Sequence, residues 1–388
     1  MHSDLTAFRN RAAYGFFEAA SLFTDPVCGA HRRVREFQLA EDLYPGKEPW
    51  EYSLMRLSLF VQSSLLAVIG ITTGLPGIGF RRAGTALLSE PFVHRQHLLE
   101  MPKLESKRFS LFFGNVAALE SGHVYTNACV APFSERVERI AKVVEEKKVD
   151  IACFCELMDF SGCQSLEQAL LKRGFKEFYY AIGANSFVSS GLFVASKYKI
   201  ANPLFTPFPA DSGRSSFTNK GVFSFDVIGK KEGCVARVHL THPQHSEESA
   251  YPTPRELSIR KEQFDCIETV VEKSGPECQV VIGDFNREAK ELQEAKWKLQ
   301  WDEGKLHKVP TWDGDDQCAK WTQQRASSPQ RLDIAMVRKG TGKIKTEIIP
   351  VGYDPRQYLS TALSDHKWLK VDVQANRSMK EMLQGIRG

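Results

Sequence analysis

The sequence lacks a large surplus of either charge, and it lacks paired cysteine motifs. Its 51 Lys and Arg residues face 47 Asp and Glu residues, a formal net charge of +4. This surplus is too small to indicate a nucleic-acid-binding protein by charge alone. Nine cysteines occur, none in the CxxC spacing typical of zinc sites. We therefore expect free thiols in a reducing compartment, with Cys153 and Cys155 as small core residues of a buried strand.

The sequence also has no internal repeat, no low-complexity tract and no obvious secretory leader. Its first residues, MHSDLTAFRNRAAYGFF, contain an acid at position 4 and no basic region followed by a purely apolar run. Export by the ordinary route is therefore not indicated. With 42% hydrophobic and 25% charged residues, the composition excludes a disordered, collagen-like or coiled-coil chain. The length fits one large domain with an appendage, or two domains.

Residues 1–106 are predicted to form an N-terminal helical region. Apolar positions recur at helical spacing through residues 1–45, which favours two short amphipathic helices before the break at Tyr44-Pro-Gly. Residues 57–80 contain no charged side chain and are long enough to cross a hydrocarbon core as a helix. Glycines, hydroxyl groups and a proline weaken that interpretation. Residues 83–106 are expected to be a connector.

Two interpretations of residues 57–80 stay open: contact with a membrane, or a helical hairpin buried against the main domain. Arg81 and Arg82 follow the segment, whereas Glu51 accompanies Arg56 on its N-terminal side. If the segment spans a membrane, this difference places the C-terminal domain in the cytoplasm. We accordingly expect an intracellular protein that is cytoplasmic or membrane-associated.

Residues 107–376 change to short apolar runs separated by helical stretches and turns. Many strands with few, widely spaced helices favour an α+β fold in which two packed mixed sheets are flanked by helices, a four-layer α/β/β/α sandwich. The predicted strands are 109–116, 150–155, 191–196, 221–228, 234–241, 279–283, 332–337 and 368–373, and the predicted helices are 132–147, 164–173 and 254–273. Residues 377–388 are expected to form a C-terminal tail.

Polar side chains lie at the ends of several of these predicted strands. Because strand ends gather at one edge of a sheet sandwich, such side chains can converge on one site. Oxygen and imidazole donors without cysteine favour Mg²⁺ or Mn²⁺, which commonly bind phosphate oxygens in proteins. The residues are Asn115, Glu156, His242, Asp284, Asn286, Asp365 and His366.

Five sequence elements follow one another in order across residues 107–376. They are the pair Asn115 and Glu156, then THPQ (241–244), GDFN (283–286), RLDIAMV (331–337) and SDH (364–366). This order resembles the endonuclease/exonuclease/phosphatase superfamily. Its neutral sphingomyelinase-like branch is resembled most closely, through Ser196-Lys197, Asn219-Lys220-Gly221 and the segment IRKEQFDCI with Arg260 and Gln263. The resemblance implies metal-assisted hydrolysis of a phosphate ester by direct attack of water.

The resemblance also implies a metal site and a general base. Glu156 would be the principal ligand of Mg²⁺ or Mn²⁺, with Asn115 and Asp365 as further ligands, direct or through water. His366 would take the proton from the attacking water. Asp333 would hold the imidazole in one tautomer and stabilise its charged form.

The remaining residues would position the water and the substrate. By the same resemblance, Asp284 would position or activate the nucleophilic water, and Asn286 and His242 would hydrogen-bond the scissile phosphate. His239 and His245, which flank His242 in the sequence, are expected to be structural or surface residues without a catalytic role.

The favoured substrate is a phosphodiester in the head group of a membrane phospholipid or sphingolipid. Asn219-Lys220-Gly221 resembles a feature of the sphingomyelinase-like branch, and Lys220 would help to bind the substrate phosphate. The uncharged segment 57–80 would hold the site at a membrane. Three alternatives stay open: a DNA or RNA nuclease of the same fold, an inositol-phosphate-type phosphatase, and a catalytically silent, membrane-tethered binding module.

Overall fold

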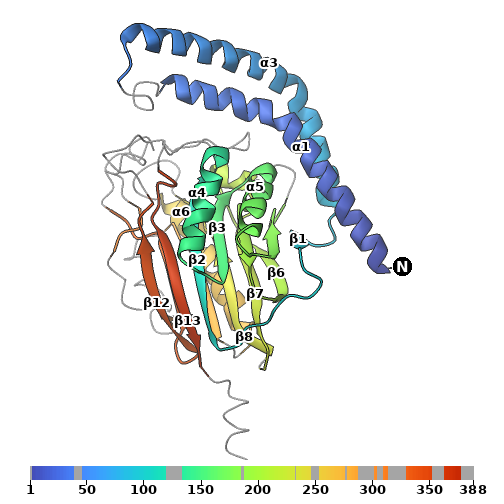
Figure 1. Ribbon diagram of the computed structural model, residues 1–388, viewed down its shortest axis with the longest axis vertical. Coiled ribbons are helices and arrows are strands. Elements are labelled where there is room, and N and C mark those ends of the chain that lie inside the picture. The colour runs from blue at the N-terminus through green and yellow to red at the C-terminus, as the bar shows by residue number, and fades with distance from the viewer. Residues whose placement is uncertain are drawn as a thin grey trace, which may run out of the picture.

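Two β-sheets packed face to face form the centre of the molecule (Figure 1). The first sheet has seven strands in the order β1 (Val93–Gln96), β4 (Glu177–Tyr180), β5 (Phe193–Ser196), β3 (Ile151–Leu157), β2 (Arg108–Ala118), β13 (Trp368–Ala375) and β12 (Gly342–Ile349). The second has six in the order β10 (Trp301–Asp302), β11 (Asp333–Arg338), β9 (Cys278–Asp284), β8 (Gly233–Thr241), β7 (Gly221–Gly229) and β6 (Ile200–Pro207). The computed structural model describes residues 2–38, 46–118, 133–184, 188–231, 233–245, 253–275, 278–286, 301–303, 309–312, 329–351 and 362–376.

Three apolar layers hold the sandwich together. Helices α4 (Phe133–Glu146) and α5 (Phe160–Leu171) pack on the outer face of the first sheet, and α6 (Pro254–Glu272) packs on the second. A separate apolar cluster fills the space between the sheets. In α4, Val137, Ile140 and Val144 are buried, the spacing of an amphipathic helix. The α+β sandwich expected from the sequence is therefore confirmed.

The strand directions bring distant residues to one end of the sandwich. Strand β2 runs parallel to β3, and β8 runs parallel to β9, so the carboxyl ends within each pair lie together. Strand β11 is antiparallel to β9, which sets Asp333 opposite Asp284. Strand β13 is antiparallel to β2, so the residues just before Trp368 lie near the carboxyl end of β2. Strand ends from both sheets thus supply one site.

The N-terminal region forms a helical hairpin of α1 (His2–Gln38) and α3 (Pro49–Leu87), with a 3-10 turn η1 (Gly213–Phe217) elsewhere in the chain. The expectation of two short helices in residues 1–45 is wrong, because α1 is one helix that contains Pro26. Packing against α3 along its length offsets the hydrogen bond that a proline removes. Helix α3 extends beyond both ends of the uncharged segment 57–80.

The stretch expected to be a connector contributes to the first sheet. Strand β1, within residues 83–106, pairs antiparallel with β4, and Phe92 and Val93 are buried. The sheet therefore begins before residue 107. The expected C-terminal tail, 377–388, lies outside the described residues. Cys153 and Cys155 are buried free thiols on β3, as predicted.

Candidate active site

Asn115 is fixed at the carboxyl end of β2 by bonds to both its side chain and its backbone. Its side-chain Oδ1 accepts a hydrogen bond from the Ala117 amide at 3.0 Å, and its Nδ2 donates to Asp284 Oδ2 at 3.0 Å. The backbone carbonyl of Asn115 accepts from Ser364 Oγ at 2.7 Å and from Trp368 Nε1 at 2.8 Å. The side chain therefore links the two sheets in a fixed orientation.

Glu156 follows the buried part of β3 in a strained backbone conformation. Its φ is 59°, a left-handed value that non-glycine residues adopt mainly where the surroundings enforce it. Its carboxylate is 19% exposed, and Oε1 lies 3.7 Å from His242 Nε2. Burial, followed by the charges of Asp365 and Asp284, raises the pKa of Glu156 to about 7. Negative charge is therefore concentrated here, as at a cation site.

His366 and Asp333 form a buried hydrogen-bonded pair. Nδ1 of His366 lies 2.8 Å from Asp333 Oδ2, and its backbone amide donates to Ser364 Oγ at 3.1 Å. The other ring nitrogen, Nε2, lies 3.9 Å from Asp284 Oδ2. Burial alone would lower the pKa of His366, but the carboxylates of Asp333 and Asp365 raise it well above the usual range.

Asp284 is the last residue of β9, and Asn286 lies in the turn that follows. The Asn286 amide donates to Asp284 Oδ1 at 2.9 Å, and Asn286 has a left-handed φ of 49°, which asparagine tolerates well. Its side-chain Nδ2 donates to the carbonyl of Pro243 at 3.1 Å. That same carbonyl accepts from Lys220 Nζ at 3.1 Å. The proline removes a backbone donor, and its carbonyl remains to hold two polar side chains.

His242 lies between the cationic and the anionic parts of the site. Its Nε2 is 3.2 Å from Lys220 Nζ and 3.8 Å from Asp284 Oδ2. Burial and the Lys220 charge lower the pKa of His242 well below its usual value, so the imidazole is neutral. A neutral ring beside the Lys220 ammonium can exchange hydrogen bonds with an anionic ligand.

The structure brings the predicted residues of both sheets together at one end of the sandwich. Asp365 completes the set: it accepts from Ser364 Oγ at 3.4 Å and raises the pKa of both Glu156 and His366. The residues brought together are Asn115, Glu156, Lys220, His242, Asp284, Asn286, Asp333, Asp365 and His366. His239 instead bonds Ser224 and Gln279 inside the second sheet, in the structural role expected of it.

Sequence reasoning missed several residues that hold the site in place. Thr311 Oγ1 accepts from the Asp333 amide at 2.9 Å, and no motif marks it. Ser364 belongs to the SDH motif, so that motif could have signalled it. Gln263 on α6 was not missed, because the segment IRKEQFDCI marks it by its resemblance to the sphingomyelinase-like branch. It accepts from the Gln244 amide at 2.9 Å and donates to the Ala210 carbonyl at 2.8 Å. These bonds tie the segment after His242 to α6.

The donor chemistry of the site fits a hard divalent cation. Two sets of potential ligand atoms lie within 4.8 Å of one another in the described residues: Cys155, His242 and Asp284, and Asp284, Asp333 and His366. Burial raises the pKa of Cys155 well above its usual value, which leaves a neutral thiol and a poor ligand. In the second set, Asp333 and His366 are hydrogen-bonded to each other, so these two ligand atoms are already occupied. The oxygens of Glu156, Asn115 and Asp365 remain the donors best suited to Mg²⁺.

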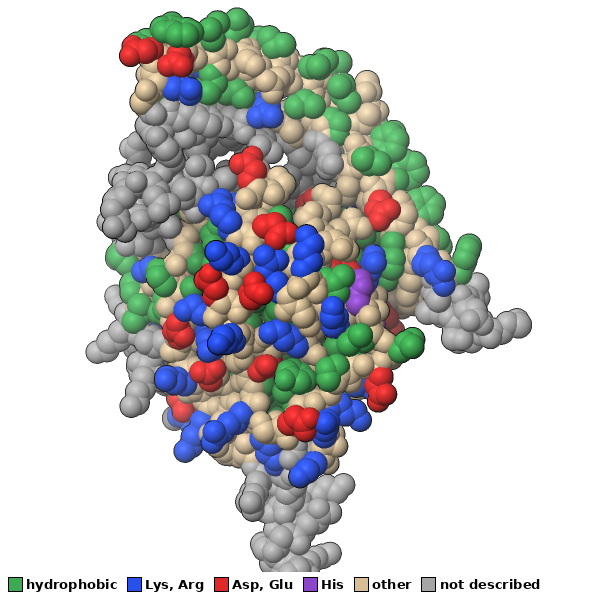
Figure 2. Space-filling view, viewed as in Figure 1, with side chains coloured by type: hydrophobic (Ala, Val, Ile, Leu, Met, Phe, Trp, Pro, Cys, Tyr) green, Lys and Arg blue, Asp and Glu red, His purple; other side chains and the backbone are tan. Residues whose placement is uncertain are grey.

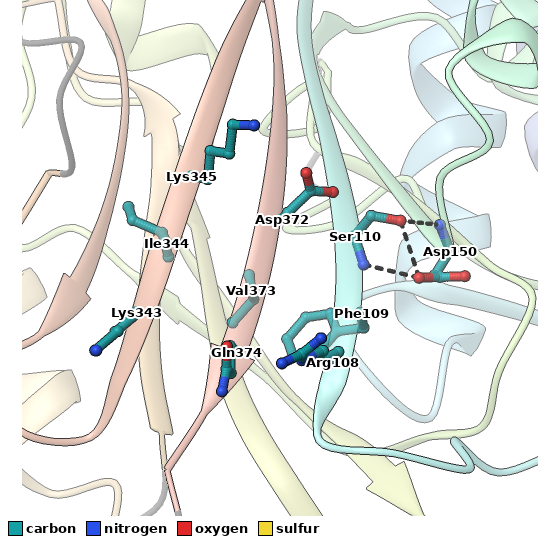
Figure 3. A pocket seen from close by; sticks show the side chains of 10 residues that line it. All are labelled: Arg108, Phe109, Ser110, Asp150, Lys343, Ile344, Lys345, Asp372, Val373 and Gln374. Carbon is teal, nitrogen blue, oxygen red and sulfur yellow. Dashed lines mark hydrogen bonds between the residues drawn. The ribbon is translucent and has the colours of Figure 1, made fainter.

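A cavity of about 490 Å³ lies at the other end of the first sheet, where β2 begins (Figure 3). Lys343 and Lys345 of β12 and Asp372 of β13 are among its lining residues. Ser110 donates to Asp150 through its amide at 2.7 Å and its hydroxyl at 2.9 Å. The lining residues include no histidine, so this cavity does not have the composition of the predicted site.

Solved structures with similar folds include a beta toxin, a sphingomyelinase and TDP2. A beta toxin variant from Staphylococcus aureus with bound magnesium ions is 20% identical, with 68% of this chain and 98% of that chain covered and a TM-score of 0.57. Sphingomyelinase C from Streptomyces griseocarneus is 15% identical, with 68% and 99% covered and a TM-score of 0.55. Truncated TDP2 from Caenorhabditis elegans is 16% identical, with 70% and 99% covered and a TM-score of 0.50.

The chain has the endonuclease/exonuclease/phosphatase fold. The order of the sequence motifs indicates this same fold. The structures to which the chain is similar include members of the sphingomyelinase-like branch. No protein-family model and no curated protein sequence matches the chain. The endonuclease/exonuclease/phosphatase fold hosts several activities, so the reaction must be argued from the site itself.

Proposed function

We propose that this protein is a metal-dependent phosphoesterase that hydrolyses a phosphodiester in the head group of a membrane phospholipid or sphingolipid. One observation carries the proposal: the buried pair of Asp333 and His366 faces Asp284, 3.9 Å from His366 Nε2. Glu156 and Lys220 lie around the same point. Hydrolysis of a phosphate ester requires a base, a hydrogen-bond acceptor for the attacking water and charged groups around the phosphate.

The geometry between His366 and Asp284 suits one attacking water. The separation of 3.9 Å allows a water to hydrogen-bond both groups. The reacting form of His366 is the neutral imidazole, and a cation beside Asp365 would oppose the carboxylate charge that raises the pKa of His366. As the water oxygen bonds to phosphorus, its proton passes to the free Nε2, and the bond from phosphorus to the ester oxygen breaks. Asp333 stabilises the resulting imidazolium. The leaving oxygen keeps the electron pair of the broken bond and takes a proton from solvent water, and His366 returns its proton to the solvent.

The substrate phosphate is expected to lie against three donors. Lys220 and Asn286 are held by the Pro243 carbonyl, and His242 lies beside Lys220. Their N–H groups can bond the phosphoryl oxygens as charge develops on them. A divalent cation held by Glu156, with Asn115 and Asp365, would supply further neutralisation of that charge.

The N-terminal hairpin supports a lipid substrate. Helix α3 is long and apolar enough to cross a membrane by length and composition, yet only 17% of its most apolar 18-residue window is buried. A core helix of similar composition would be mostly buried. Proteins classed by name as sphingomyelinases are among the structures with a similar fold. These two observations favour a membrane lipid over a nucleic acid.

The test compares substrates in parallel. Purified protein with Mg²⁺ is incubated with sphingomyelin vesicles, mixed phospholipid vesicles, plasmid DNA and RNA. Asp284→Ala is the inactive blank, and Asp372→Ala, a half-exposed aspartate on β13, is the matched control. Head-group release that is lost only in Asp284→Ala supports the proposal. Cleavage of nucleic acid with intact lipids would overturn the lipid substrate, and absence of hydrolysis throughout would overturn the enzyme assignment.

A further inference from the structure

Helix α3 has two opposite faces of different character. Small residues recur every seven positions on one face and are buried, namely Ser63, Gly70, Gly77 and Gly84. Aliphatic residues recur every seven positions on the other and are 58%, 56%, 64% and 77% exposed, namely Leu54, Val61, Val68 and Leu75. Successive residues of a helix turn by about 100°, so Val61 and Ser63 point in nearly opposite directions.

The small-residue face holds α1. A Cβ on Gly70 would meet Val27 Cγ2 at 2.6 Å, and one on Gly77 would meet Thr24 Cγ2 at 2.7 Å. Thr73 Oγ1 donates to the Phe23 carbonyl at 2.6 Å. The two helices are therefore close-packed and antiparallel. The glycines of α3 serve this contact, and its aliphatic face has no partner in the described part of the chain.

The hairpin is fixed to the sandwich. Phe17 of α1 is 1% exposed and stacks on Phe160 of α5 with ring centroids 5.2 Å apart. Gln164 Nε2 donates to Glu18 Oε1 at 2.8 Å. In Figure 1 the hairpin arches over one end of the sandwich, with α3 on the outside of the upper arch. Figure 2 shows hydrophobic side chains along that outer edge.

A lipid surface matches the outer face of α3. Residues 57–80 contain no charge, and the exposed apolar side chains continue along the helix for more than six turns. The exposed hydroxyl groups of Ser58, Ser64 and Thr72 lie among these side chains, but within residues 57–80 no charge does. Scattered apolar side chains are normal on soluble proteins, whereas a long, largely apolar face marks an interaction surface. The side chains are Trp50, Leu54, Leu57, Phe60, Val61, Leu65, Val68, Ile69, Ile71 and Leu75.

The charges of α1 oppose passage of this hairpin through a bilayer. A Cβ on Gly29 would meet Leu66 Cδ1 at 3.1 Å, so the antiparallel register sets residues 31–36 beside residues 59–64. Residues 31–36 read HRRVRE. A spanning α3 would carry three arginines and a glutamate into the hydrocarbon with it, which is costly. At the other end of the hairpin, Phe17 and Glu18 of α1 contact α5 of the sandwich.

We propose that the α1/α3 hairpin is an in-plane membrane anchor. Its outer α3 face lies in the boundary between head groups and acyl chains, and both ends of α3 stay on one side of the bilayer. Strand β13 points away from the hairpin (Figure 1), so its first residue, Trp368, and the neighbouring His366 lie at the hairpin end. An anchor in this orientation sets the end of the sandwich with the candidate active site toward the membrane. Access of that site to a lipid substrate rests on the proposed function.

The first experiment measures binding of the full chain to sealed vesicles of phosphatidylcholine and sphingomyelin by flotation. A double substitution, Val61→Glu with Val68→Glu, should weaken binding by more than about tenfold, because each carboxylate opposes insertion into the acyl region. The matched control, Leu99→Glu with Leu204→Glu, changes two other exposed leucines and should bind as the unsubstituted chain does. Equal binding of all three proteins would overturn the proposal.

The second experiment distinguishes an in-plane helix from a spanning one. Cysteine replaces Ser53 or Arg82, which are exposed near opposite ends of α3, and a membrane-impermeant thiol reagent is added outside the vesicles. Both variants should react above the background of the unsubstituted chain. Protection of one position until detergent is added would show a spanning helix and overturn the proposal. A stable dimer without vesicle binding would show that a second copy covers the face.

A soluble diester separates this inference from the proposed function. The Val61→Glu and Val68→Glu chain should hydrolyse bis(p-nitrophenyl) phosphate at the rate of the unsubstituted chain, because α3 contains no site residue. If neither chain hydrolyses the diester while vesicle binding still depends on Val61 and Val68, the proposed function fails and the anchor stands. If the substituted chain alone loses hydrolysis, the loss of binding reflects misfolding, and the anchor assignment falls with it.

Discussion

The proposed reaction depends on the imidazole of His366. Asp333 holds one ring nitrogen at 2.8 Å, and the other faces Asp284. His366→Ala removes the base and should lower kcat by about 10² to 10⁴-fold, with the thermal unfolding midpoint close to that of the unsubstituted chain. His94→Ala, at a histidine whose side chain is 41% exposed on β1, should keep its activity. Near-normal turnover of His366→Ala would remove this residue from the mechanism.

His239 should make the free energy of unfolding depend on pH, independently of catalysis. Its two ring nitrogens bond Ser224 and Gln279, and burial lowers its pKa from 6.5 to about 4. Between these pH values the unfolded chain binds the proton and the folded chain does not, so stability falls as the pH falls. The maximum effect is about 3 kcal/mol for this difference in pKa.

His239→Gln should reduce that pH dependence, because glutamine does not titrate. Urea unfolding between pH 6.5 and pH 4 measures the free energy of unfolding of both proteins. We expect a smaller loss of stability with falling pH in the variant, even if the variant is less stable at pH 7. An identical dependence of the free energy of unfolding on pH in the two proteins would show that folding does not lower the pKa of His239.

Single residues also show why the site could be predicted from the sequence only in part. Glu156 and Asp284 stand directly after buried strands, so their positions mark strand ends even without a structure. The left-handed φ of Glu156 depends on packing around it and leaves no mark in the sequence. Thr311 supports Asp333 from 22 residues away, and only the folded chain brings the two together.

At the scale of elements, β1 and the hairpin should contribute unequally to stability. A chain that begins at residue 89 keeps β1, whereas a chain that begins at residue 106 also loses buried Phe92, Val93 and Leu104. Removal of large buried side chains costs about 2–5 kcal/mol each. The shorter chain should therefore have a lower urea midpoint than the longer one. Equal midpoints would contradict the assignment of β1 to the sheet core.

The close contact between α1 and α3 gives a matched pair of glycine substitutions. Gly70→Leu forces a side chain against Val27, where a Cβ alone would come within 2.6 Å, whereas a Cβ on Gly79 meets nothing within 4 Å. Gly70→Leu should lower the thermal midpoint, since overpacking costs about 1–3 kcal/mol. Gly79→Leu should keep or raise it through better helix propensity. The reverse order would contradict the packed hairpin.

The elements that the sequence patterns missed or divided wrongly each have a feature that hides the expected pattern. Strand β12 alternates exposed charged residues, Lys343 and Glu347 among them, with half-buried ones, so it contains no long run of apolar residues. Strand β6 has a register irregularity between Ala201 and Leu204, which interrupts its period of two. Helix α1 contains a proline that tertiary packing tolerates. Strands β3 and β9 were predictable because each contains an uninterrupted apolar run, IACFC and VVI.

At the scale of the whole molecule, the proposed hydrolytic site and the exposed apolar face of α3 lie toward the same end. The site is assembled from strand ends of both sheets, which the order of motifs predicts without giving distances. The orientation of the hairpin was open, because membrane contact and burial against the domain predict the same apolar sequence. Helix α1 binds one face of α3 and leaves the other exposed. That exposure is contrary to burial of the whole segment against the domain and supports the proposed contact with a membrane.

The central claim is that this end of the sandwich is a cation-dependent phosphodiesterase site. The most direct test is the rate of bis(p-nitrophenyl) phosphate hydrolysis by the full chain as Mg²⁺ is restored after EDTA treatment, alongside Glu156→Gln. We predict no turnover in EDTA, recovery with Mg²⁺, and a half-activating Mg²⁺ concentration about tenfold or more higher for Glu156→Gln. Turnover that persists in EDTA, or superimposed Mg²⁺ curves for the two proteins, would contradict the account.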